Sequence, residues 1–262
     1  KLDLGSLPVD SVASQHMQIE AIKLAFADTY RWVADERYMT DVTAADLLSD
    51  GYLTERARLI RSDRAGNVAH GMPPKGGTVY LTAADESGRM ISLIQSNYMG
   101  FGSGVVVPGT GVSLQNRGHS FTLQDGHPNQ VAPAKRPFQT IIPGFLTKDG
   151  KPQMSFGVMG GNMQPQGHVQ TLVRMLVHQQ QPQAACDAPR WKVGEGLNVD
   201  FESTMSRTLV DGLKALGHQF NPTADTYMDF GSGQFIWRLS DDMADGYVAA
   251  SDSRRDGQAV GY

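Results

Sequence analysis

The sequence predicts a layered α/β fold, either one large domain or one domain with an attached piece, from three observations. The chain has 262 residues, 40% of them hydrophobic and 19% charged, which is enough apolar material for a sizeable core. Some segments repeat apolar residues at helical spacing, whereas others alternate with a period of two. Because the predicted strands are grouped, with predicted helices before, between and after them, we expect sheets and helices to pack in layers.

The N-terminal part is predicted to be helical. Residues 14–35 place a stripe of apolar side chains on one helix face, with Ser11 or Ser14 as the N-cap. Residues 44–61 are predicted to form shorter helices that break at Gly51. Residues 63–77 are polar and rich in Gly and Pro, which predicts a loop.

A β-hairpin is predicted next, with strands over residues 78–83 and 90–95 joined by the turn ESG. The glycine-rich stretches GFGSG (100–104) and PGTG (108–111) follow, where the backbone must turn tightly or approach another group closely. Two more strands are predicted over residues 140–147 and 153–159.

The C-terminal part returns to the helical period and then to strands. A helix is predicted over residues 169–177, and another begins at Ser203 as N-cap and ends at Gly217. The alternation of residues 235–239 predicts a late strand, and YVAASD at 247–252 predicts one more.

Composition disfavours several classes of partner and cofactor. The 23 basic and 27 acidic residues are scattered without runs, so neither a nucleic acid nor a membrane is an expected partner. Seven histidines show no metal-binding spacing, and no phosphate-binding loop or GxSxG motif occurs, so we expect no metal and no cofactor. The single cysteine, Cys186, lies among small residues and is predicted to be a buried structural thiol.

Thr78 is a candidate nucleophile. A threonine hydroxyl needs a base beside it, and a threonine that is the first residue of a chain can use its own α-amine as that base. Residues 72–77, MPPKGG, form a breaker-rich approach to Thr78 that would let its hydroxyl attack the carbonyl of Gly77. The alternative is an ordinary turn that enters a strand.

Gly160 and Gly161 are candidates for an oxyanion hole. They follow a predicted strand and precede a predicted helix, so their N–H groups could point together at developing negative charge. Glycine tolerates the backbone dihedrals that such an arrangement requires. The alternative is a tight strand-to-helix connection.

At these residues the chain resembles the gamma-glutamyltranspeptidases and the related cephalosporin acylases, which are N-terminal nucleophile hydrolases. The resemblance runs from about residue 15 to the C-terminus and is carried by the motifs HMQIEAIKLAFADTYRW, GGTVYL, SNYMGFGSG, KRPFQTIIPGF, GVMGGNMQPQGH, APRW and SDSRRDGQAVGY. It implies a four-layer αββα sandwich built from a precursor that cuts itself before a threonine. Residues 1–77 would then be the last part of the large subunit, and residues 78–262 the small subunit.

The same resemblance assigns the reacting groups. Thr78 would be the nucleophile, first for cleavage of the Gly77–Thr78 bond and then for attack on a substrate amide. Ser96 falls where the family places a hydroxyl that hydrogen-bonds the nucleophile. Gly160 and Gly161 fall on the oxyanion hole.

Substrate recognition departs from the family pattern. The Asn, Gln and Asp that typical transpeptidases use for the α-amino group of the glutamyl donor are replaced by Tyr98, Arg117 and Ser120. An arginine would repel an ammonium and could instead bind a carboxylate through two hydrogen bonds. The family's paired serines correspond to Gln139 and Thr140, which keep polar contacts available.

Three functions remain open. The first is a gamma-glutamyltranspeptidase-like enzyme that passes the acyl group of a small-molecule amide to water or to an amine through an acyl-enzyme. The second is a cephalosporin or glutaryl acylase without gamma-glutamyl specificity. The third is a non-catalytic relative that keeps the fold as a binding module. The resemblance also implies the remainder of the large subunit as a partner.

Overall fold

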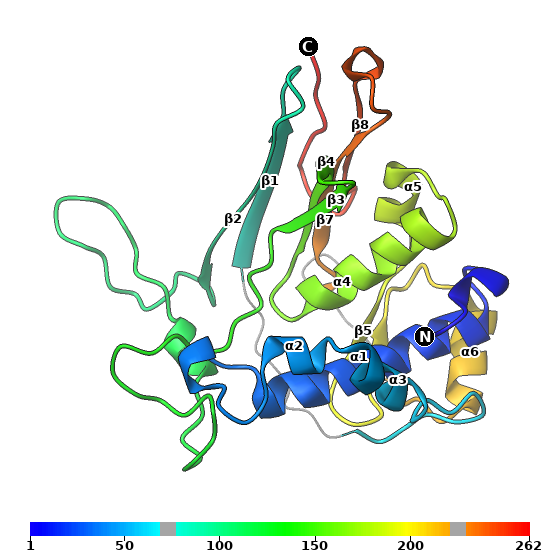
Figure 1. The fold of residues 1–262 in the computed structure, drawn as a ribbon, viewed down its shortest axis with the longest axis horizontal. Helices are drawn as coiled ribbons and strands as arrows, with labels where there is room; N and C mark the ends of the chain where they lie inside the picture. Colours follow the sequence, from blue (N-terminus) through cyan, green and yellow to red (C-terminus); the bar gives the residue numbers. More distant parts are fainter. Residues whose placement is uncertain (69–76, 221–228) are drawn as a thin grey trace. The chain divides into compact units, whose positions relative to one another are not determined.

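A computed structural model describes residues 1–68, 77–220 and 229–262, and its contacts divide the chain into two compact units (Figure 1). Unit 1 contains residues 1–72, 116–139 and 191–222, and unit 2 contains residues 73–115, 140–190 and 223–262. Most of the predicted loop before Thr78, residues 69–76, lies outside the described residues.

Unit 2 contains a β-hairpin and a four-stranded sheet. The predicted hairpin is confirmed as the antiparallel pair β1 (Gly77–Ala84) and β2 (Met90–Tyr98). The sheet is antiparallel in the order β3-β4-β7-β8. Its strands are β3 (Gly144–Lys148), β4 (Lys151–Met159), β7 (Ser232–Arg238) and β8 (Tyr247–Ser251). The prediction that a strand covers residues 140–147 is wrong at its start, because Pro143 lacks the N–H that would continue the strand.

Helices cover one face of this sheet. Helix α4 (Met163–Leu172) continues into a π-helical turn, η4 (Val173–Val177), and α5 (Pro182–Asp187) follows. Buried residues of the sheet and the helices form the core, namely Met154, Phe156, Val158, Met175, Ala185, Cys186, Phe235 and Ala250. The helix was predicted to begin at residue 169, but α4 begins at Met163. The first turns of α4 bury polar side chains, such as Gln164 and Gln166, so they show no apolar repeat in the sequence.

The hairpin packs on the other face of the sheet. A Cβ at Gly157 of β4 would lie 2.6 Å from the ring of Tyr80, so glycine is required there for β1 to approach. Ser92 of β2 donates to the Phe156 carbonyl of β4 at 3.3 Å. Unit 2 therefore stacks a hairpin, a sheet and helices as three layers, which confirms the predicted layered α/β arrangement. The outward apolar side chains of the hairpin are exposed: Val79, Leu81, Ile91 and Leu93.

Unit 1 is organised around the long helix α1 (Val12–Trp32), which carries more buried residues than any other described element of the unit. Ser11 is confirmed as the N-cap, and its hydroxyl accepts a hydrogen bond from the Ser14 N–H. Helix α6 (Arg207–Ala215) packs on α1, where a Cβ at Gly212 would lie 2.4 Å from Val12. Gly217 ends this helix in the left-handed region, as predicted.

Two predictions in unit 1 are corrected, and two strands were not predicted. Gly51 lies inside α3 (Asp50–Ala57), and the break after α2 (Ala44–Leu47) is made by Ser49, whose hydroxyl caps α3. Helix α6 begins at Arg207 because Ser203 lies in a turn closed by the Met205 N–H and the Glu202 carbonyl. The sequence analysis missed β5 (Trp191–Val193) and β6 (Val199–Phe201), which are too short to show a period.

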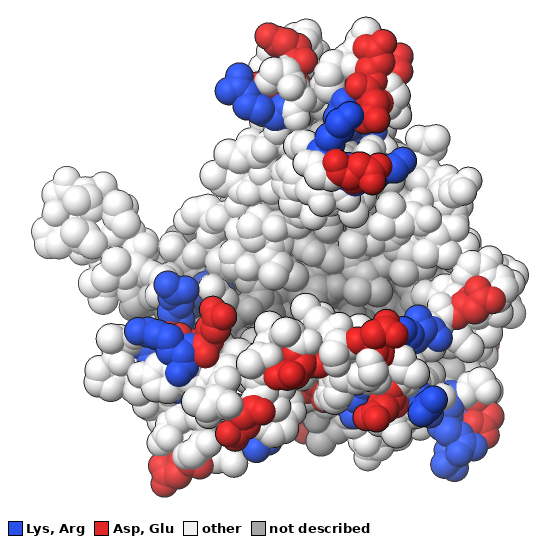
Figure 2. All heavy atoms as spheres, in the orientation of Figure 1, with Lys and Arg blue, Asp and Glu red and all other residues white. Residues whose placement is uncertain are grey.

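The remaining elements are short. Four 3₁₀ turns complete the described chain: η1 (Leu4–Ser6), η2 (Glu36–Tyr38), η3 (Arg117–Ser120) and η5 (Met243–Asp245). Among the described residues, no helix combines the length and the apolar character that a bilayer crossing needs. Figure 2 shows acidic and basic side chains intermixed on one face, while the loop that follows β2 carries no charge.

Candidate active site

The hydroxyl of Thr78 lies against the hydroxyl of Ser96. Thr78 is buried on the inner face of β1, and its Oγ1 donates to Ser96 Oγ at 3.1 Å. The strand register explains this contact, because Gly77 pairs with Tyr98 whereas Val79 pairs with Gln95. Two residues of β2 therefore oppose Thr78 alone, and such a bulge turns a side chain out of the regular alternation.

Tyr98 holds Ser96 in place through its backbone. Its N–H donates to Ser96 Oγ at 2.9 Å. Tyr98 adopts φ 77, a left-handed conformation that a bulky aromatic residue rarely takes. Its side chain is buried, so packing helps to enforce the strained backbone. The Ser96 oxygen thus receives two hydrogen bonds, one from the backbone and one from Thr78.

The contacts between β1 and β4 run toward the end of β4 in the direction of Thr78. Thr82 hydrogen-bonds Ser155, and Tyr80 packs on Gly157, so the two strands run in opposite directions across the contact. Thr78 precedes Tyr80 by two residues on β1, and Met159 follows Gly157 by two residues on β4. Gly160 and Gly161 follow Met159 directly.

Both glycines have backbone conformations that other residues avoid, since φ is 132 at Gly160 and 60 at Gly161. A Cβ at Gly160 would lie 3.0 Å from the Cα of Gly231, so the backbone of a neighbouring turn also requires glycine there. Asn162 follows in the right-handed region and caps α4. Gly161 in the left-handed region followed by Asn162 in the right-handed region turns the N–H groups of Gly161 and Asn162 toward a common point, which suits an anion. Thr140 reaches the same turn, donating to Asn162 Oδ1 at 3.3 Å.

A buried ion pair that sequence reasoning missed supports the turn against Gly160. Arg190 donates to the carbonyls of Phe230 and Gly231 at 3.0 and 3.2 Å, and to Asp252 Oδ2 at 2.7 Å. Asp252 also accepts the N–H of Gly233 at 2.7 Å. Arg190 belongs to the motif APRW and Asp252 to the motif SDSRRDGQAVGY. Both motifs carry the family resemblance, and this was the one feature of the sequence that could have pointed to the pair.

Nearby ionisable groups are held neutral. Burial, and then the charge of Asp252, raise the pKa of the Cys186 thiol, so the predicted buried cysteine is no candidate nucleophile. Burial, helped by Arg190, lowers the pKa of His168 to about 4. The neutral His168 ring accepts the Val158 N–H at 3.0 Å and so supports the last part of β4.

The remaining predicted substrate-binding residues are divided between the units. Tyr98 and Thr140 lie in unit 2, together with Thr78 and Ser96, whereas Arg117, Ser120 and Gln139 lie in unit 1. Arg117 is buried in η3 and Gln139 is exposed. The Ser120 carbonyl accepts a hydrogen bond from Asn129 at 2.7 Å.

Comparisons with known proteins identify the family of the chain. The sequence model of a family described as gamma-glutamyltranspeptidase matches residues 1–262. A glutathione hydrolase-like YwrD proenzyme of Bacillus subtilis is 33% identical, over 99% of this chain and 49% of its own length. An oxamate amidohydrolase proenzyme of Klebsiella pneumoniae is 34% identical, over 97% of this chain and 48% of its own.

Solved structures give the same result for the fold. The crystal structure of a cephalosporin acylase from Bacillus halodurans is 48% identical with a TM-score of 0.86, over 95% of this chain and 45% of that one. The chain described here thus spans about half the length of the curated relatives it matches.

Proposed function

Because the chain belongs to the gamma-glutamyltranspeptidase family, we propose that it forms the catalytic half of an N-terminal nucleophile amidohydrolase with Thr78 as the nucleophile. One observation carries this proposal. The Thr78 hydroxyl is hydrogen-bonded to Ser96 on the strand that packs on β4, and Gly160 and Gly161, which follow β4, both have positive φ. A positioned hydroxyl next to convergent backbone N–H groups is the arrangement that acyl transfer needs.

The proposal divides the chain at the Gly77–Thr78 bond. The Thr78 Oγ attacks the Gly77 carbonyl carbon, the C–N bond breaks, and the nitrogen takes up a proton to leave an ester. Water then hydrolyses the ester, which releases residues 1–77 with a new carboxylate and leaves Thr78 with a free α-amine. Residues 1–77 are the end of the large subunit and residues 78–262 are the small subunit. The residues that precede this chain in the gene product would supply the fourth layer of an αββα sandwich, over the exposed apolar face of the hairpin.

Turnover uses the amine that cleavage creates. The Thr78 α-amine accepts the proton of Oγ as Oγ bonds to the substrate carbonyl carbon, and the N–H groups of Gly160 and Gly161 hold the oxyanion. Collapse breaks the substrate C–N bond, and the leaving amine takes the proton from the α-ammonium. Water or an amine acceptor then attacks the acyl ester and restores Thr78. The Ser96 hydroxyl keeps Oγ in line through both steps.

The acyl group is the finer part of the proposal. A gamma-glutamyl or related acyl donor is expected from the family. However, Arg117 and Ser120 occupy positions at which typical transpeptidases bind the α-ammonium of the glutamyl donor. A guanidinium favours a carboxylate over an ammonium. This observation favours the second candidate function, an acylase for glutaryl-like amides that lack the α-amino group.

Mass spectrometry of the complete gene product tests the nucleophile. We expect two fragments, the smaller beginning at Thr78, and a single intact chain for Thr78→Ala. Thr82→Ala, which removes a hydroxyl from the same face of the same strand, is the matched control and should still cleave. An uncleaved wild-type chain that turns over neither a gamma-glutamyl nor a glutaryl anilide would refute the enzyme and favour the non-catalytic relative. Faster turnover of the gamma-glutamyl anilide would refute only the role given to Arg117.

A further inference from the structure

Two further hydroxyl side chains lie on the inner face of the β1–β2 hairpin, close in the chain to Thr78 and Ser96. Tyr80 follows Thr78 by two residues on β1, and Ser92 precedes Ser96 by four residues on β2. Tyr80 is buried and Ser92 is half-buried, whereas Val79 on the opposite face of β1 is exposed. The acyl-transfer steps proposed above use neither of these two hydroxyls.

The hydrogen bonds of Tyr80 and Ser92 have one direction. The Ser92 hydroxyl has a single proton, which it donates to the Phe156 carbonyl of β4 at 3.3 Å. The Tyr80 hydroxyl lies 2.7 Å from Ser92 Oγ and must therefore be the donor in that bond. Burial raises the pKa of Tyr80 to about 12, so the phenol keeps its proton and donates at neutral pH. The chain of hydrogen bonds thus runs from β1 through β2 to the backbone of β4.

The ring of Tyr80 holds the same junction by packing. A Cβ at Gly157 would lie 2.6 Å from two carbons of this ring, so the ring rests directly on the Gly157 backbone. Close packing of a rigid ring on a strand fixes the separation between the two strands. Gly157 precedes Gly160 by three residues, just as Tyr80 follows Thr78 by two. The junction is therefore close in the chain to the candidate nucleophile on one side and to the glycine pair on the other.

A different tyrosine ties the far end of the hairpin to the sheet. Tyr247 of β8 donates to the carbonyl of Asp85, which directly follows β1, at 2.8 Å. Asp85 is seven residues from Thr78 along an extended strand, which corresponds to about 23 Å at about 3.3 Å per residue. The hairpin is thus held at two separate places, one next to the candidate nucleophile and the other remote from it.

We propose that Tyr80 and Ser92 are positioning residues for acyl transfer. Together they clamp the hairpin onto β4 and so set where Thr78 stands relative to Gly160. The inference rests on the proposed function of Thr78 as the nucleophile. The nucleophile and the glycine pair belong to different strands, so their geometry depends on how firmly the strands are joined, and a misplacement of about 1 Å reduces a rate by about 100-fold. Because the clamp acts through the position of Thr78, its loss should lower kcat and leave KM unchanged.

Steady-state kinetics of the processed enzyme test this role, with a gamma-glutamyl and a glutaryl anilide as substrates. Tyr80→Phe keeps the ring on Gly157 and removes only the hydroxyl, and we expect kcat to fall about tenfold at unchanged KM. Ser92→Ala removes the other member of the chain of hydrogen bonds and should give a similar loss. The double variant should lose no more than the larger of the two single losses, because both changes break one network.

Tyr247→Phe is the matched control. It also removes a tyrosine hydroxyl that joins the hairpin to the sheet, but at the end remote from Thr78, so it should keep the wild-type kcat. All variants are prepared from the complete gene product and are compared at a temperature at which each is folded. A loss of kcat confined to Tyr80→Phe and Ser92→Ala would support the clamp, because a general loss of stability would affect Tyr247→Phe as well.

Four results overturn the inference. They are a wild-type kcat in Tyr80→Phe or in Ser92→Ala, an equal fall of kcat in Tyr247→Phe, a loss that appears in KM alone, and fully additive losses in the double variant. Failure of the proposed function is seen separately, because the wild type would then turn over neither anilide or Thr78→Ala would remain active.

Discussion

Asp252→Asn should strongly destabilise the protein and slow its turnover. The carboxylate of Asp252 accepts hydrogen bonds from the side chains of Arg190 and Arg254 at 2.7 and 3.1 Å and from the Gly233 N–H at 2.7 Å. Its side chain is fully buried, and that of Arg190 is 2% exposed. Asparagine has nearly the same shape, so the change removes the charge and an acceptor without creating a cavity.

The expected cost follows from the charge left behind. Removing one partner of a buried ion pair costs about 3–5 kcal/mol, because the other charge stays in a poorly solvating interior. At about 2–4 °C per kcal/mol for a domain of this size, the melting temperature should fall by about 6–20 °C. Burial opposes ionisation of Asp252, but Arg190 and Arg254 outweigh it and lower its pKa. The pair therefore stabilises the fold above the ordinary pKa of an aspartate and is lost as the pH falls through the lowered value.

Denaturant unfolding and calorimetry of the complete gene product measure this effect. Asp187→Asn is the matched control, since Asp187 is exposed next to Cys186 and should change stability little. At a temperature where the variant is folded, turnover should still be reduced, because Arg190 holds the turn that packs on Gly160. Equal stability of Asp252→Asn and Asp187→Asn would refute the reasoning about the buried pair.

Three further predictions concern the candidate active site and the buried side chain of His218. Ser96→Ala should reduce kcat in the processed enzyme while Ser96→Thr retains it, and equal kcat for both would show that the hydroxyl does not orient Thr78. Gly160→Ala should lose turnover and about 1–3 kcal/mol of stability, since its φ is strained for alanine and its Cβ would press on Gly231; an active, stable variant would contradict this. Burial lowers the pKa of His218 to about 3, so below pH 6.5 the unfolded chain binds a proton there that the folded chain does not. The free energy of unfolding should therefore fall by about 1.4 kcal/mol per pH unit from pH 6.5 toward 3. Urea unfolding at a series of pH values measures this slope, and the same slope in His218→Gln would disprove the prediction.

The sequence was sufficient for features that depend on residues close together along the chain. The hairpin of β1 and β2 and the N-cap at Ser11 follow from local periodicity and capping chemistry, and the structure confirms both. The need for glycine at 160 and 161 was also visible, because a glycine pair between a strand and a helix indicates unusual dihedrals, and both residues have positive φ. Thr78 was identified from its chemistry and its neighbours in the chain, and its role stays a proposal.

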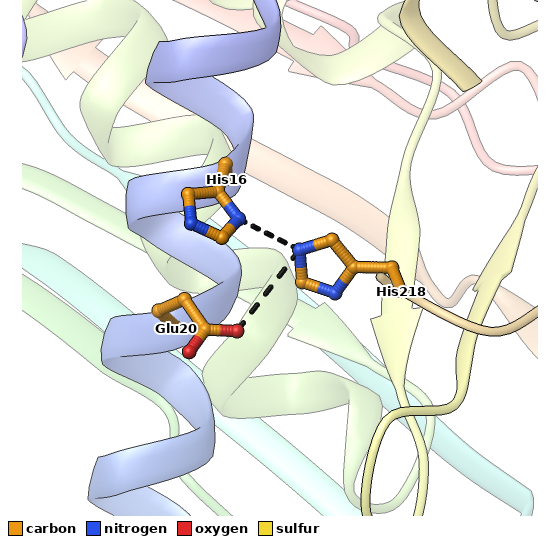
Figure 3. Close-up of side chains that lie close together, drawn as sticks. All are labelled: His16, Glu20 and His218. Carbon is orange, nitrogen blue, oxygen red and sulfur yellow. Dashed lines mark hydrogen bonds and ion pairs between the residues drawn. The ribbon is translucent and has the colours of Figure 1, made fainter. Parts of the chain in front are cut away.

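Other features depend on residues far apart in the sequence, which no local pattern can indicate. The bulge that turns Ser96 onto Thr78 is a matter of strand register, and the left-handed backbone of Tyr98 is enforced by burial. The Arg190–Asp252 pair joins residues separated by 61 intervening positions, and its strength comes from exclusion of water. The buried contacts of His16 with His218 and the Arg61 carbonyl, and of His218 with Lys23, likewise join residues far apart in the sequence (Figure 3). Periodicity and residue chemistry thus identify elements and reactive groups, whereas burial and long-range packing decide which groups meet, how they are oriented and what charge they carry.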